Sequence, residues 1–255
     1  FTEGPAKKCG ASLKKMIFIM QKDCICAPIC LTKQRSISMA KIKAVLFDMD
    51  GVLIDAKDWH YEALNEALAL FGVEISRYDH LHTFDGLPTR VKLEMLSEQY
   101  YLPKELHGFI NEIKQKKTME YITRNCHPTF IHEYALSRLM NEGYKIAVCS
   151  NSVRKSIDHM MECAALSEYI DLIVSNEDVT RAKPDPEMYD YAIRRFGLMP
   201  QECLVIEDNP KGVQAGLASG AHVLKVEYTT AVTYSNIKRK IAEVENDQYT
   251  DPCNG

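Results

Sequence analysis

The feature that most constrains this chain is a short apolar run, Ile42 to Phe47, which stops at the acidic pair Asp48 and Asp50. The run has no helical period, so it predicts a strand buried on both faces of a sheet. In an extended chain, residues two apart point the same way. Both carboxylates would then project together, and Gly51 would permit a sharp turn after them. Carboxylates held this close repel one another and favour a bound cation. The same residues equally suit a helix-capping aspartate beside a solvated one, so other segments have to decide.

Strand and helix patterns alternate over most of the remaining chain. Further strands are expected at 145–149, 172–174, 203–206 and 221–226, and helices at 131–142, 156–164, 186–196 and 213–219. Alternation of this kind requires a parallel sheet with right-handed crossovers. The predicted fold class is therefore α/β, with a doubly wound parallel sheet. Sheets of this class bind ligands at the carboxyl ends of their strands.

A long stretch without any strand pattern separates the first strand from the second. Apolar residues from Trp59 to Phe71 recur at helical spacing, and further helices are expected at 89–100, 104–117 and 118–126. We therefore predict a small all-helical cap at 54–128, inserted after the first strand into a core formed by 39–53 and 129–232. Residues 1–38 are expected to be a leader or an unstructured segment. Residues 233–255 are expected to form a C-terminal helix, at 237–245, and a tail.

Charge and hydropathy argue against several kinds of partner. The net charge of −4 and the isoelectric point near 6.1 do not favour a nucleic acid or an anionic membrane surface. The sequence has no run of about 18 apolar residues that could span a bilayer. The apolar patch near the amino end is interrupted too soon for a signal peptide. We expect a cytoplasmic protein, a monomer or a weak homodimer, that acts on a small molecule.

The cysteines divide into two groups. Cys24, Cys26 and Cys30 form a cluster near the amino end, but their spacing is not that of a zinc knuckle and no matching second half follows. Metal binding is not expected there. Cys149 and Cys203 lie in predicted core strands, where reduced and buried thiols are the usual state in a cytosolic protein.

Three of the predicted strands end in polar side chains, and one loop supplies a lysine directly before a proline. These residues are Asp48 and Asp50, Ser150 and Asn151, Glu207 and Asp208, and Lys183. In a doubly wound sheet the strand ends converge on one crevice. Oxygen ligands of this kind suit Mg²⁺. A carboxylate not shielded by the metal can attack phosphorus, and a lysine and a hydroxyl can donate to the phosphoryl oxygens.

Each part of this set also has an ordinary structural explanation. Ser150 and Asn151 could cap the next helix, Lys183 could lie on the surface, and Glu207 and Asp208 could belong to a turn. The order and spacing of all four segments make the combination of these explanations improbable. The set therefore predicts phosphoryl-transfer chemistry.

Together the four segments resemble the motifs of the haloacid dehalogenase superfamily. Residues 47–53, Phe-Asp-Met-Asp-Gly-Val-Leu, look like its first motif, and Cys149-Ser150-Asn151 like its second. Lys183-Pro-Asp-Pro looks like the third, and Glu207-Asp208-Asn-Pro-Lys-Gly like the fourth. The resemblance covers about 41–228. The predicted helical insertion is similar to the small cap of the β-phosphoglucomutase and phosphoglycolate phosphatase branch.

The resemblance implies a role for each motif residue. Asp48 would be the nucleophile, and Asp50 the general acid and then the base that activates water. Mg²⁺ would be held by Asp48, the main-chain carbonyl of Asp50 and Asp208, with Glu207 close by. Ser150 and Lys183 would hold the transferring phosphoryl group, with Asn151 beside them at the substrate. An aspartate at position 50 favours phosphate esters over dehalogenation, because a carbon–halogen bond breaks without an acid or Mg²⁺.

Substrate choice is expected to lie in the cap. His60 matches a histidine of the mutase branch, although it would equally suit a solvated helix position. Thr89 and Arg90 lie in the segment that faces the substrate in that branch, where the mutase pattern has an arginine at the position of Thr89. This displacement weighs against mutase activity. Lys117 belongs to a basic run that could reach a second phosphate, or could simply face solvent.

The function predicted is a Mg²⁺-dependent phosphatase that hydrolyses a small phosphorylated metabolite, plausibly a sugar phosphate, through an aspartyl phosphate. A β-phosphoglucomutase-like isomerase is the first alternative. A non-catalytic phosphometabolite-binding protein is the second, although it would have no need for Asp50. Receiver domains of signalling proteins fit badly, because they place the acidic pair and the phospho-acceptor on different strands and lack a helical insertion of this size.

Overall fold

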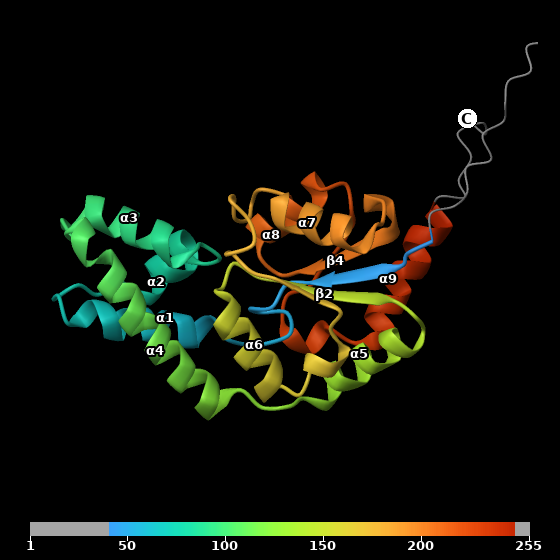
Figure 1. Ribbon diagram of the computed structural model, residues 1–255, viewed down its shortest axis with the longest axis horizontal. Helices are drawn as coiled ribbons and strands as arrows, with labels where there is room; N and C mark the ends of the chain where they lie inside the picture. The colour runs from blue at the N-terminus through green and yellow to red at the C-terminus, as the bar shows by residue number, and fades with distance from the viewer. Residues whose placement is uncertain (1–40, 248–255) are drawn as a thin grey trace, which may run out of the picture. The chain divides into compact units, whose positions relative to one another are not determined.

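The computed structural model describes residues 41–247, so the predicted leader at 1–38, with Cys24, Cys26 and Cys30, lies outside the described residues. The centre of the described part is a sheet of five parallel strands in the order β3-β2-β1-β4-β5 (Figure 1). The strands are β1 Ala44–Phe47, β2 Lys145–Cys149, β3 Leu172–Val174, β4 Cys203–Glu207 and β5 His222–Lys225. All five lie within one or two residues of the positions predicted from the apolar runs.

Alternate residues of each strand enter two different hydrophobic clusters, because side chains of a strand point to opposite faces. Val45 and Phe47 of β1 belong to one cluster, together with helices α5 Phe130–Asn141, α6 Arg154–Cys163 and α9 Tyr234–Asp247. Ala44 and Leu46 belong to the other cluster, with α7 Glu187–Phe196 and α8 Pro210–Ala218. Figure 1 shows α7 and α8 on one side of the sheet and α5, α6 and α9 on the other. The predicted doubly wound α/β fold is confirmed.

Within the described residues, no strand lies between β1 and β2. Before α5, the helices of this stretch are α1 Lys57–Ala69, α2 Arg77–Asp79 with a π-helical turn His80–Phe84, α3 Thr89–Tyr100, a 3₁₀ turn Lys104–Leu106 and α4 His107–Asn125. We call residues 57–125 the helical lobe. It has a hydrophobic cluster of its own, in which Leu64 and Leu68 of α1 meet Leu93 of α3 and Ile110 of α4. Its treatment as a separate domain stays a prediction.

Two details of the helical lobe differ from the sequence prediction. The helices expected at 104–117 and 118–126 are one continuous helix, α4. Thr118 is buried and its hydroxyl donates to the carbonyl of Lys114 at 2.9 Å. That hydroxyl is therefore satisfied inside a continuing helix and does not cap a new one. The π-helical turn at His80–Phe84 was not predicted from the sequence.

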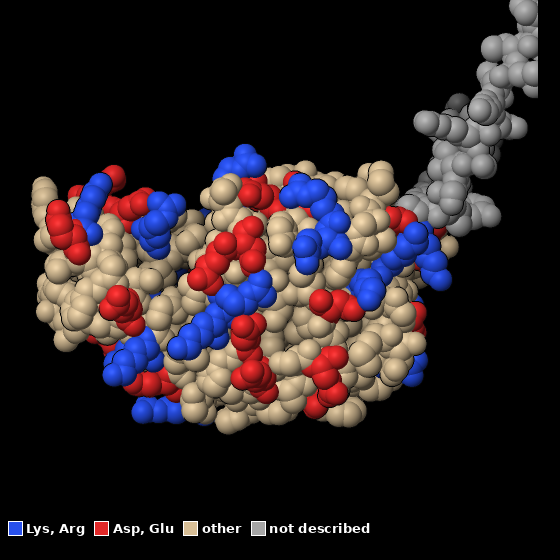
Figure 2. All heavy atoms as spheres, in the orientation of Figure 1, with Lys and Arg blue, Asp and Glu red and all other residues tan. Residues whose placement is uncertain are grey.

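The register of the sheet brings the predicted site residues to one edge. Phe47, the last residue of β1, lies beside Val148 of β2 and Ile206 of β4. Asp48 and Glu207 come directly after two of these residues, and Ser150 comes two residues after Val148. All three therefore lie together at the carboxyl edge of the sheet. Figure 2 shows acidic and basic side chains interspersed over the visible face of the molecule. No helix within residues 41–247 is long and apolar enough to cross a membrane.

A matched pair of leucines tests the packing of the helical lobe. Leu68 is fully buried in the cluster of the lobe, whereas Leu70, just beyond the end of α1, is 65% exposed. We expect Leu68→Ala to lower the free energy of unfolding by about 2–5 kcal/mol, because it leaves a cavity. Leu70→Ala should change it by less than about 0.5 kcal/mol. Urea unfolding measures both. A two-step transition whose first step alone shifts in Leu68→Ala would support an independently folding cap, and equal effects of the two variants would contradict this packing.

Candidate active site

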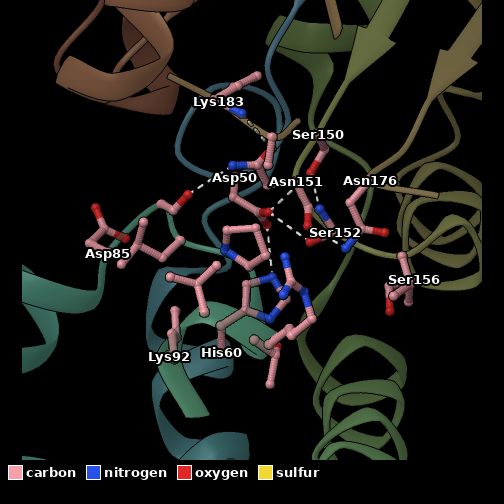
Figure 3. Close-up of a pocket in the computed structure, with 18 of the residues that line it drawn as sticks. Asp50, His60, Asp85, Lys92, Ser150, Asn151, Ser152, Ser156, Asn176 and Lys183 are labelled. Atoms are coloured by element: carbon pink, nitrogen blue, oxygen red, sulfur yellow. Dashed lines mark hydrogen bonds and ion pairs between the residues drawn. The ribbon is translucent and has the colours of Figure 1, made fainter. Parts of the chain in front are cut away.

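A cavity of about 850 Å³ lies between the carboxyl edge of the sheet and the helical lobe. Asp48, Asp50, Ser150, Lys183 and Glu207 line it from the sheet side. Figure 3 shows Lys183 and Ser150 on one side of Asp50, and His60 and Lys92 of the lobe on the other. The structure therefore brings together side chains at the carboxyl ends of β1, β2 and β4, with a lysine from the loop after β3.

Lys183 joins these strand ends. Its Nζ donates to Asp48 Oδ1 at 2.6 Å, to Glu207 Oε1 at 2.7 Å and to the carbonyl oxygen of Cys149 at 2.8 Å. An ammonium group has three donors, so all of them are used. Burial by itself would lower the pKa of Lys183, but the charges of Asp48 and Glu207 outweigh burial and raise it. The lysine is therefore held charged inside the protein.

Glu207 is fully engaged by its neighbours. Its Oε1 accepts from Lys183 and also from the hydroxyl of Tyr189 at 2.6 Å. Its Oε2 accepts from the backbone N–H groups of Asp208 and Asn209. A Cβ at position 212 would lie 1.8 Å from Oε1, so only glycine fits against this carboxylate. Glu207 therefore has the least capacity left for a metal ion. Tyr189 was not predicted, because its position in an amphipathic helix marks it only as a core residue.

Asp48, Glu207 and Asp208 form a buried acidic trio. One carboxylate oxygen from each lies within 4.8 Å of the others, a grouping that could hold a metal ion. Within residues 41–247, neither oxygen of Asp208 has a hydrogen-bond partner. Burial and then the charge of Glu207 raise the pKa of Asp48 well above its usual range, and Lys183 offsets this only in part. Buried oxygens without hydrogen bonds and mutual repulsion both fit a divalent cation with oxygen ligands.

One cation of the chain itself already lies at Asp208. Lys57 Nζ, from the first residue of α1, is 2.5 Å from Asp208 Oδ2, an ion pair without hydrogen-bond geometry. Gly51, with φ of +94°, makes room for this pair, since a Cβ there would lie 2.2 Å from Asp208 Oδ2. Lys57 was not predicted as a site residue. Its sequence position after the first motif carries no signal for this contact.

Asp50 turns away from the acidic trio and toward the helical lobe. Its Oδ1 lies 3.1 Å from His60 Nε2, and its Oδ2 accepts from the Ser152 hydroxyl at 3.2 Å, with Ser150 Oγ 3.5 Å away. Burial alone would raise the pKa of Asp50, but the neighbouring His60 and Lys114 lower it. His60 Nδ1 is in turn 3.3 Å from Lys114 Nζ. Lys114, His60 and Asp50 thus form a chain of polar contacts from α4 to the first motif.

The remaining predicted residues differ in where they lie. Asn151 lines the cavity, and its Nδ2 donates to the carbonyl of Gly86 at 2.9 Å, so it connects the second motif to the lobe. Thr89 and Arg90 also line the cavity, but Arg90 is paired with Glu94. Lys117 does not line the cavity.

Instead, Lys117 forms ion pairs with Glu66 at 2.9 Å and with Glu120. The lysine of its basic run that enters the cavity is Lys114, one turn earlier on α4. The sequence shows three lysines close together. It does not show which of them lies on the inner side of the helix.

Two further contacts join the lobe to the fourth motif. Asn209 Nδ2 donates to Asp85 Oδ2 at 2.9 Å, and Lys211 Nζ donates to the carbonyl oxygen of Asp85 at 2.7 Å. Asn209 also caps α8, because its side chain accepts from the backbone N–H of Lys211. The loop around Asp85 is therefore held against the same segment that carries Glu207 and Asp208.

Several known proteins are similar to this chain. A pyrophosphatase PpaX of Bacillus cereus is 28% identical over 201 residues, which cover 74% of this chain and 85% of that protein. A phosphorylated carbohydrates phosphatase of Thermotoga maritima is 27% identical over 179 residues, covering 70% and 82%. Among solved structures, a β-phosphoglucomutase from Clostridium difficile has a TM-score of 0.70 at 22% identity and covers 79% of this chain and 98% of its own. CbbY from Rhodobacter sphaeroides, in complex with phosphate, has a TM-score of 0.65 at 20% identity, covering 74% and 88%.

The structural likenesses show that the fold is shared, and the family assignment comes from the sequence. The family model described as haloacid dehalogenase-like hydrolase matches residues 45–226. This match includes all four motifs and the helical lobe between the first and the second. The chain therefore belongs to the haloacid dehalogenase-like hydrolase family.

Proposed function

We propose that this hydrolase is a Mg²⁺-dependent phosphatase that acts on a small phosphorylated metabolite through a phosphoryl group transferred to Asp48. The observation that carries the proposal is the separation of the two motif aspartates. Asp48 is anchored by Lys183 within the acidic trio, whereas Asp50 is held apart from the trio by His60 and Ser152. This separation supports attack by Asp48 beside the proposed cation site and proton transfer by Asp50.

The residues present fit the proposed metal ion. Asp48 and Asp208 would hold Mg²⁺ with the main-chain carbonyl of Asp50, since the oxygens of Asp208 are buried and lack hydrogen bonds within the described residues. Glu207 would lie close to the ion without binding it directly, because its own oxygens already accept hydrogen bonds. When bound, the ion would neutralise charge on the phosphoryl oxygens.

The chain's own residues account for both halves of the reaction. A carboxylate oxygen of Asp48 attacks phosphorus, the bond from phosphorus to the ester oxygen breaks, and Asp50 gives that oxygen a proton. Asp50 then takes a proton from water, the water oxygen attacks phosphorus, and the bond to Asp48 breaks to release inorganic phosphate. Lys183 and Ser150 would position the phosphoryl group. The lowered pKa of Asp50 suits the second, base-catalysed half, and Asp50 must take up a proton before it can act as the acid in the first.

Hydrolysis is favoured over phosphate migration within a sugar by two observations. Sequence relatives include a phosphatase of phosphorylated carbohydrates and a pyrophosphatase. In addition, Arg90 pairs with Glu94 and is largely exposed, so it does not present a free guanidinium to a substrate. The mutase-like structural neighbours support the shared fold alone.

A substrate panel tests the activity. We expect Mg²⁺-dependent release of inorganic phosphate from some members of a set of phosphorylated sugars and related metabolites, and loss of release in EDTA that returned Mg²⁺ reverses. Glucose 6-phosphate appearing from β-glucose 1-phosphate without phosphate release would make the protein a mutase. Full activity after chelation would refute the metal requirement.

The nucleophile assignment predicts the effect of Asp48→Asn. The amide keeps the shape of the side chain but cannot attack phosphorus, so phosphate release should fall by about three orders of magnitude or more. Asp55→Asn, an equivalent change at an exposed aspartate outside the cavity lining, should retain activity. Far-ultraviolet circular dichroism checks that both variants are folded. Substantial turnover by folded Asp48→Asn protein would rule out Asp48 as the nucleophile.

The ion pair between Lys57 and Asp208 leads to a prediction about the affinity for Mg²⁺. Because the ammonium group of Lys57 lies at Asp208 Oδ2, it competes with any other cation for that carboxylate. We expect Lys57→Met to bind Mg²⁺ about tenfold more tightly in calorimetric titrations, since the competing charge is removed. Lys43→Met, which removes an ion pair with Glu202 before β1, serves as the control. Unchanged or weaker binding in Lys57→Met would show that Lys57 does not compete.

A further inference from the structure

The lobe side of the cavity carries more positive charge than its carboxylates can balance. Lys57, Arg90, Lys92 and Lys114 line this side, whereas Asp85 is the single carboxylate that the lobe contributes to the lining within the described residues. Lys57 and Arg90 have partners of their own in Asp208 and Glu94. The positive charge that no carboxylate of the lobe balances therefore belongs to Lys92 and Lys114, which are both buried.

Lys92 is the least satisfied of these cations. It lies on α3, its residue is 8% exposed, and its Nζ makes no hydrogen bond or ion pair with any residue between 41 and 247. Burial lowers its pKa to about 8, and the more distant charges of Asp85 and Asp50 only partly oppose this. The side chain of Lys92 is buried, but its Nζ is open to the cavity. A charge held there without a counter-ion is costly, so an anion in the cavity would stabilise it.

The groups beside Lys92 point to the same conclusion. His80 is 3% exposed, lines the cavity, and has both ring nitrogens buried without a hydrogen-bond partner in the described part of the chain. Burial and then the charge of Lys92 lower its pKa to about 4, so it is neutral and offers one N–H donor. Burial and then Lys92 likewise lower the pKa of Lys114, to about 7. The charge of Lys92 thus disfavours a charge on His80 and on Lys114, and all three residues line the same cavity.

We propose that His80, Lys92 and Lys114, which we call the lobe cluster, form a subsite for a second acidic group of the substrate, a phosphate or a carboxylate. This inference rests on the proposed phosphatase function and restricts its substrates to small metabolites with two acidic groups. One group would lie at Asp48 and Lys183, and the other at the lobe cluster across the cavity. A volume of about 850 Å³ leaves room for a molecule larger than a single phosphate.

Binding measurements separate this subsite from catalysis. Full-length Asp48→Asn protein with Mg²⁺ would be titrated calorimetrically with two matched pairs of probes. Fructose 1,6-bisphosphate and fructose 6-phosphate differ by a second phosphate, whereas phosphoglycolate and 2-hydroxyethyl phosphate differ by a carboxylate. We expect the two-acid member to bind at least about tenfold more tightly in one pair or both, as hydrogen bonds to charged groups would produce. The pair that shows the preference identifies the acidic group.

Combined with Asp48→Asn, Lys92→Met should weaken binding of the preferred two-acid probe about tenfold. It should change the affinity for the matched one-acid probe by less than about twofold. Lys104→Met, the same change at an exposed lysine of the lobe, should alter neither. Equal affinities within both pairs would overturn the subsite even if Lys92→Met failed to fold. A preference that survives in folded Lys92→Met protein would overturn it as well.

Phosphate release from the same probes by the unmodified enzyme distinguishes the two proposals. Turnover without a binding preference would overturn the subsite and keep the phosphatase. A preference without turnover of any probe, together with no phosphate release across the wider substrate panel, would overturn the phosphatase and keep the subsite.

Discussion

The site depends on one buried ammonium group. Lys183 Nζ contacts Asp48 after β1, the carbonyl of Cys149 at the end of β2 and Glu207 at the end of β4, so a single loop residue joins three strand ends. Without that charge, Asp48 and Glu207 would face each other in a buried site, where carboxylates repel strongly. The acidic trio can exist at the edge of the sheet because this lysine already balances part of it.

Much of this arrangement could be predicted from the sequence. Apolar runs such as Ile42 to Phe47 and Lys145 to Cys149 mark buried parallel strands, and the polar residues that follow them mark the carboxyl edge. The topology of a parallel sheet brings motifs that are distant in sequence together at that edge, and this can be inferred without any knowledge of side-chain contacts. Predictions that depended only on where the strands lie and where they end therefore agree with the structure.

Predictions that depended on the direction of a helix face were less successful. Lys114 and Lys117 are three residues apart in the same basic run, yet only Lys114 enters the cavity. Which of them does so is decided by the packing of α4 against α1, which a single sequence does not show. Tyr189 and Lys57 were missed for a related reason. Their contacts with Glu207 and Asp208 come from tertiary packing, and their local sequence is ordinary for a helix.

The ion pair between Lys57 and Asp208 has a consequence for motion, because Lys57 belongs to the lobe and Asp208 to the sheet edge. The pair is therefore one of the contacts that hold the lobe against the core, along with Asn209 and Lys211 at Asp85. A metal ion bound at Asp208 would displace Lys57 from this contact, so occupancy of the site and closure of the lobe would be energetically coupled. Such a coupling would be reciprocal: whatever closes the lobe would change the affinity for the cation by the same factor by which the cation changes closure.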